Sequence, residues 1–135
     1  MRAPDWVRGA LGAWARQWWR IHTTDASIAG TLGKIRTEAE GAAHSRAGQH
    51  FDEVYTGDAL AVRLALDGAP WAVWQILGAT YLPRGEYTAG ERARALGISR
   101  AEYFARLDAA HWYLVGRIER ENPGSTAEPS RRLGG

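Results

Sequence analysis

The sequence predicts an all-α fold: a compact helical domain with a C-terminal helix-turn-helix. Apolar residues recur at helical spacing in several stretches, no stretch alternates apolar and polar residues as a strand does, and glycine or proline separates the stretches. We expect one domain over residues 1–120 and a disordered tail over 121–135. Within the domain we expect a tryptophan-rich helix at 5–20, a loop-rich segment at 21–50, core helices at 56–82 and the helix-turn-helix at 88–120.

The first predicted helix is recognised by adjacent apolar pairs that recur every fourth position. This spacing places the pairs on one face of a helix, which we interpret as core. Asp5 follows Pro4 and is the expected N-cap. Docking of this helix on a partner protein stays open. The pairs are Trp6 and Val7, Ala10 and Leu11, Trp14 and Ala15, and Trp18 and Trp19.

The loop-rich segment is dominated by small and polar residues. Ile28, Leu32 and Ile35 suggest only a short amphipathic helix inside it, and GAAHSRAGQH at 41–50 indicates an exposed loop.

Two core helices are expected next. Thr56 is the predicted N-cap of the first, which ends near Leu66. Pro70 begins the second, which covers 71–82 and is apolar around most of its circumference, so it should be the central buried helix.

The helix-turn-helix prediction depends on the turn and its two flanking caps. Thr88 and Glu91 fit a capping box at the start of the first helix. Ala93 is small where the two helices would cross, and Gly97 can take the left-handed conformation of a tight turn. Ser99 is the expected cap of the second helix, with Glu102 completing a second capping box.

The second helix has a predicted buried stripe and an opposite polar face. In a helix-turn-helix the first turns of this helix enter the major groove of DNA. Arg100 would read a guanine edge, Glu102 could accept from cytosine although capping competes, and arginines nearby would contact phosphates. The stripe is Tyr103, Leu107, Ala110, His111, Leu114 and Ile118. The predicted DNA-binding residues are Arg92, Arg94, Ser99, Arg100, Ala101, Glu102 and Arg106.

The basic residues permit a nucleic-acid partner without requiring one. The net charge is +2, and Lys34 is the one lysine among 17 basic residues. Arginine matches phosphate and guanine geometry, but a GC-rich genome also enriches arginine. Because the charge is low, we expect a further partner to contribute to DNA binding.

No feature of the sequence predicts catalysis, a cofactor or a metal. The chain has no cysteine, which excludes thiolate zinc sites, and His44 and His50 are interpreted as solvated. A glycine-rich phosphate loop and an HExxH motif are both missing, and no Ser–His–Asp set is singled out. We also expect no signal peptide and no membrane span, and therefore a cytoplasmic protein.

These residues together resemble the phage late-gene antitermination protein Q family in its zinc-free form. The resemblance has two anchors, which span about half of the chain. The second anchor also looks like the promoter-reading domain of sigma factors. The anchors are Leu11-Gly12-Ala13-Trp14-Ala15 in the first helix, and the run from Tyr81 through Ala93, Leu96-Gly97-Ile98-Ser99, Tyr103, Leu107 and Ala110 to Leu114.

The resemblance implies a function in the cytoplasm of a bacterial host. Such proteins bind double-stranded DNA near a late promoter, load onto RNA polymerase paused there with its sigma factor, and make it read through terminators. Two copies per complex are plausible. The resemblance implies DNA contacts by Arg100, Ala101, Glu102 and Arg106, with Ser99 as the helix cap.

Other functions remain open at this point. The chain could be another DNA-binding phage protein, either a sigma-like activator or a packaging subunit. It could also be a protein-only adaptor, in which the tryptophan-rich helix and the helical hairpin both bind protein. An enzyme is the least favoured class.

Overall fold

The structure, a computed structural model, describes residues 2–22, 26–44 and 55–121, and all regular structure within these ranges is helical. The prediction of an all-α fold is therefore confirmed for this part of the chain. The tail was predicted over 121–135, but Glu121 is the last residue of a helix. The rest of the predicted tail and the end of the expected loop, 45–50, lie outside the described residues. The helices are α1 (Asp5–Ile21), α2 (Ile28–His44), α4 (Gly57–Leu66), α5 (Trp71–Tyr81), α6 (Ala89–Leu96) and α7 (Arg100–Glu121).

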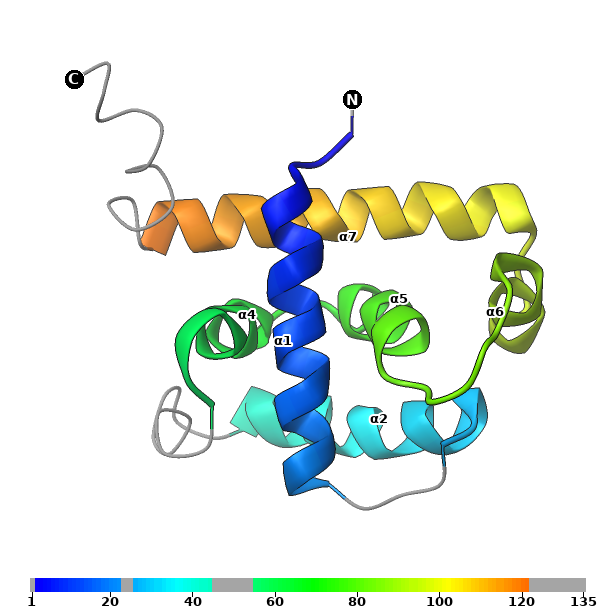
Figure 1. The fold of residues 1–135 in the computed structure, drawn as a ribbon, viewed down its shortest axis with the longest axis horizontal. Helices are drawn as coiled ribbons and strands as arrows, with labels where there is room; N and C mark the ends of the chain where they lie inside the picture. The colour runs from blue at the N-terminus through cyan, green and yellow to red at the C-terminus, as the bar shows by residue number, and fades with distance from the viewer. Residues whose placement is uncertain (1, 23–25, 45–54, 122–135) are drawn as a thin grey trace.

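The helices surround one core, with α1 lying across the others (Figure 1). In this view α7 and α2 run along opposite sides of the molecule, and α4 and α5 lie between them. Helix α1 packs on α4, α2 packs on α5, and α7 contacts α4, α5 and α6. This arrangement brings the start of α1 next to α7, far from it in sequence.

Helix α1 buries the face that its apolar spacing predicts, including Val7, Leu11, Trp14 and Trp18. The predicted N-cap is wrong by one residue, because Pro4 takes the extended N-cap conformation. Asp5 is already helical, and its carboxylate lies 3.5 Å from Arg8 Nη1.

The expected loop-rich segment contains α2, a helix of 17 residues, so the prediction of only a short helix is wrong. Ile28, Thr31 and Ile35 are buried at its start. Past Ile35, Glu38 also faces inward, and its carboxylate accepts hydrogen bonds from Trp18 Nε1 and Arg63 Nε, both at 2.9 Å. Because this contact is polar, apolar periodicity does not reveal it.

The cap predicted at Thr56 forms differently. Thr56 is the N-cap of α4 by backbone conformation, but its side chain makes no capping hydrogen bond. Its hydroxyl accepts from Gln17 Nε2 at 3.4 Å, and its amide donates to Gln17 Oε1 at 3.0 Å. Thr56 therefore ties α4 to α1.

The helix predicted at 71–82 forms as α5, and five of its 11 residues are buried: Trp74, Ile76, Leu77, Gly78 and Ala79. At Gly78 the helix approaches α2 so closely that a Cβ would lie 2.9 Å from Ile35 Cδ1. The glycine thus sets the spacing of α5 and α2, and α5 in turn supports α7.

Candidate nucleic-acid interface

Each of the two C-terminal helices begins at a hydroxyl cap. Glu91 N–H donates to Thr88 Oγ1 at 3.0 Å, and Thr88 N–H donates to Glu91 Oε1 at 2.7 Å, which is the predicted capping box. The hydrogen bond from Thr88 N–H to the Glu91 carboxylate lowers the pKa of Glu91. At α7, Glu102 N–H donates to Ser99 Oγ at 3.0 Å, while the Glu102 carboxylate accepts from Arg106 Nε at 2.8 Å. Ser99 therefore caps α7 as predicted. The Glu102 side chain pairs with Arg106 one turn later in the same helix, and not with the Ser99 amide as a capping box would require.

The connection between α6 and α7 is a three-residue turn closed by backbone hydrogen bonds. Gly97 has φ +74°, the left-handed conformation expected of it. Gly97 N–H donates to Arg94 O and Ile98 N–H to Ala93 O, each at 3.0 Å. This pair of bonds is the Schellman pattern, which ends a helix and turns the chain sharply. Ala93 is buried and Ile98 packs against the core, so the turn is anchored.

Helix α7 has the two faces that the sequence predicts. Its stripe packs into the core, with Leu107 half-buried and the other five residues buried. The five predicted DNA-contact residues at its start are all exposed. They are Ser99, Arg100, Ala101, Glu102 and Arg106.

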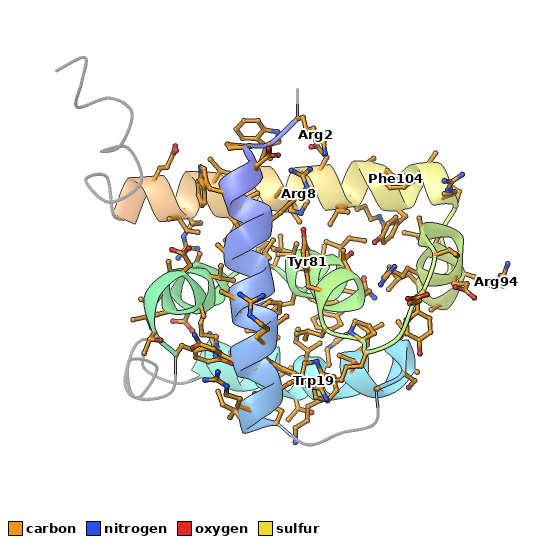
Figure 2. The ribbon with its side chains drawn as sticks, viewed as in Figure 1. Arg2, Arg8, Trp19, Tyr81, Arg94 and Phe104 are labelled. Carbon is orange, nitrogen blue, oxygen red and sulfur yellow. The ribbon has the colours of Figure 1, made fainter. Side chains whose placement is uncertain are left out.

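The two arginines of α6 differ in position. Arg92 is half-buried, and its Nε donates to Ala79 O at 2.9 Å while its Nη1 donates to Tyr87 O. These bonds hold α6 against the end of α5, so two of the donors of Arg92, which was predicted to contact DNA, are bound within the protein. Arg94 is exposed and points away from the body of the molecule in Figure 2.

The charges on the exposed face of α7 are partly paired. Arg106 and Glu102 form an ion pair one turn apart, and both side chains are more than two-fifths exposed. Such exposed pairs contribute about 0–1 kcal/mol, so a phosphate can displace the carboxylate at little cost. The Arg100 guanidinium lies 5.6 Å from the ring centroid of Phe104.

A pocket of about 390 Å³ lies beside this face, between the start of α1, the end of α5 and the first half of α7. Figure 2 shows Arg2 and Arg8 near the crossing of α1 and α7, with Tyr81 below and Phe104 farther along α7. Sequence reasoning missed this pocket, because its walls come from segments distant in the chain. One signal was available: Phe104 is a large ring on the polar side of the α7 stripe, and it is 49% exposed.

A partly buried hydrogen bond forms one wall of this pocket. Tyr81 Oη and His111 Nε2 lie 2.8 Å apart. Burial, with a further contribution from the charge of Arg8, lowers the pKa of His111 to about 4. Burial also raises the pKa of Tyr81. Both side chains are therefore neutral at neutral pH, and the positive charge of the pocket comes from Arg2 and Arg8.

Two kinds of feature are missing from the part of the chain that the structure describes. No cluster of three or more histidine, aspartate or glutamate side chains there is arranged to hold a metal ion. No helix there is both long and apolar enough to cross a membrane.

No protein-family model, curated protein sequence or solved structure matches the chain.

Proposed function

We propose that the chain is a DNA-binding transcription antitermination factor whose helix α7 reads a short double-stranded site near a phage late promoter. The observation that carries the DNA-binding part is the exposed start of α7, which directly follows the turn that Gly97 makes in the left-handed conformation. The antitermination part comes from the family resemblance.

In this proposal α6 and α7 act as a helix-turn-helix. Arg100 reads a guanine edge, because its guanidinium presents two donors that match O6 and N7. Ala101, with a small exposed side chain, allows close approach to a base edge or a thymine methyl group. Arg94 and Arg106 bind phosphates on either side, and Ser99 offers its hydroxyl to the backbone.

The charges indicate that DNA is not the only partner. Glu91 and Glu102 lie exposed beside the proposed DNA contacts, and the net charge is only +2. Because neutralised phosphates supply most nonspecific affinity, this surface would bind DNA weakly alone. We propose that bacterial RNA polymerase, paused with its sigma factor, supplies the remaining affinity.

The DNA-binding part is tested by selecting bound sequences from a pool of random duplexes and then measuring the affinity of the protein for the enriched sequences. Arg100→Ala should cost about 1–3 kcal/mol on the selected site and relax one base position. Arg94→Ala should weaken binding to all sequences alike, and it should reduce the slope of log affinity against log salt concentration by about 1. Arg20→Ala is the matched control, because Arg20 is exposed in the last turn of α1, at the opposite end of that helix from α7.

The result that contradicts this assignment is equal binding by Arg100→Ala and the parent protein. If the parent enriches no sequence and binds no duplex, with or without polymerase, DNA reading is wrong and the adaptor function is favoured. That second function has one observation of its own, since Trp112 on α7 is 36% exposed, as a protein-binding residue would be.

The antitermination part is tested by transcription with purified polymerase across a terminator. Added protein should increase the fraction of transcripts that continue past the terminator, and Arg100→Ala should reduce this effect. If initiation rises while readthrough stays constant, the chain is an activator.

A further inference from the structure

We propose that the pocket between α1, α5 and α7 binds a nucleotide unit, with its base against Phe104 and its phosphate on Arg2 and Arg8. The ligand would be a single unpaired nucleotide, which is not needed for α7 to read duplex DNA. Nucleotide binding in the pocket and duplex reading by α7 can therefore be tested, and can fail, separately.

The phosphate position follows from the charges of the pocket. Arg2 is exposed and Arg8 is half-buried, and both line the same cavity. The two contacts of the Arg8 guanidinium, to Ala3 O and Asp5 Oδ1, are long at 3.5 Å each, so it can turn to an incoming anion. Arginine binds phosphate through paired, charge-assisted hydrogen bonds.

The base position follows from the aromatic wall. Phe104 lines the pocket and is half exposed, and Leu107 extends the apolar surface into the pocket. An unpaired base stacks on an exposed aromatic ring because every base has a flat π-face. The cavity of about 390 Å³ is within the size range of small-molecule sites and larger than a bare phosphate needs.

The remaining walls are polar but carry only one charge. The hydrogen-bonded pair of Tyr81 and His111 is neutral, so it can meet a base edge or a sugar without competing for the phosphate. Asp108 is the one acidic residue that lines the pocket. It repels an anion nearby, but it can accept hydrogen bonds from a sugar hydroxyl or an exocyclic amine. The pocket thus has a cationic side and an aromatic side.

The test is calorimetric titration of the full chain with dAMP, deoxyadenosine and inorganic phosphate. We expect dAMP to bind at least about tenfold more tightly than deoxyadenosine or inorganic phosphate, because stacking and phosphate contacts act together. Phosphate binding as tightly as dAMP would overturn the nucleotide assignment, and so would failure of dAMP and single-stranded DNA to bind.

Variants assign the binding to this pocket. Phe104→Ala and Arg2→Gln should each weaken dAMP binding by about fivefold or more. Trp112→Ala and Arg16→Gln are the matched controls, since these exposed residues lie on α7 and α1 but do not line the pocket. Equal losses in the controls and in the pocket variants would overturn the proposal.

A competition experiment separates two sources of the nucleotide. If a single-stranded oligodeoxynucleotide displaces dAMP and binds more tightly, the ligand is an unpaired nucleotide within a DNA strand. If dAMP binds at least as tightly, the ligand is a free mononucleotide. Either result supports the pocket. The loss of duplex binding in Arg100→Ala is measured separately, so the failure of one proposal does not imply failure of the other.

Discussion

Single glycines of the α6–α7 region have opposite structural roles. Gly97 needs its left-handed φ of +74°, whereas Gly90 is helical, and a Cβ on it would meet only Thr88 Oγ1 at an ordinary 3.8 Å. Gly97→Ala should therefore destabilise the fold by about 1–2 kcal/mol. Gly90→Ala should stabilise it by about 0.5–1 kcal/mol, because alanine favours the helix. Urea unfolding measures both, and shifts of the same sign would contradict this distinction.

His111 makes the stability depend on pH. Its pKa is lowered to about 4 by burial and by Arg8, while Asp108 acts in the opposite direction. Since the unfolded chain protonates near pH 6.5, it takes up a proton more readily than the folded chain does. The stability from neutral His111 is therefore complete above about pH 6.5 and is lost as the pH falls toward 4.

The check is the free energy of unfolding at about pH 7.5 and about pH 5, where carboxylates remain mostly ionised. The parent should lose more stability between these values than His111→Gln does. Burial also lowers the pKa of His22, and because His22 is present in both proteins its contribution cancels. Identical pH dependence in the two proteins would refute the role of His111.

At the scale of helices, apolar spacing predicted every element whose burial is apolar. It located α1 and α5 to within one residue at each end, because tryptophan, leucine and valine mark their buried faces. It predicted too short a helix for α2, because the main contacts of its second half are the hydrogen bonds of Glu38, and of the side chains described there only Ala39 adds apolar packing. Local hydroxyl and glycine signals, such as Thr88 and Gly97, were sufficient for the α6–α7 turn.

The close crossing of α2 and α5 gives a prediction at the same scale. In Gly78→Ala the new Cβ would lie 2.9 Å from Ile35 Cδ1 and 3.4 Å from its Cγ2. Ile35 is fully buried and cannot move freely, so the change should cost about 1–3 kcal/mol. Ile35→Val removes Cδ1, the nearer atom. In a double-mutant cycle the combined change should therefore cost less than the sum of the two single changes. Strict additivity would show that the two side chains do not meet.

At the scale of the molecule, the features that sequence reasoning missed join distant segments. The pocket combines Arg2, Tyr81 and Phe104, which have no common local pattern. The polar network of Glu38 joins α1, α2 and α4 in the same way. A single sequence reports spacing within an element, whereas these contacts depend on how whole helices pack.

The Glu38 network predicts how the whole fold responds to a lost charge. Arg63 has a side chain only 4% exposed, stacks 5.1 Å from the Trp74 ring and pairs with Glu38 at 2.9 Å. Glu38→Gln keeps an acceptor for Trp18 but removes the carboxylate charge beside the buried Arg63 guanidinium. Breaking a buried pair in this way costs about 3–5 kcal/mol, a large share of the stability of a small domain.

Replacing both partners separates the charge from the packing. Arg63→Met fills similar space without a charge, so the variant carrying Glu38→Gln and Arg63→Met should be more stable than Glu38→Gln alone. Urea unfolding followed by tryptophan fluorescence measures this directly, because Trp18 and Trp74 both contact the network. If the double variant is the less stable of the two, the arginine is held mainly by contacts other than its counter-charge. The ion pair would then not be what joins α2 to α4 across the core.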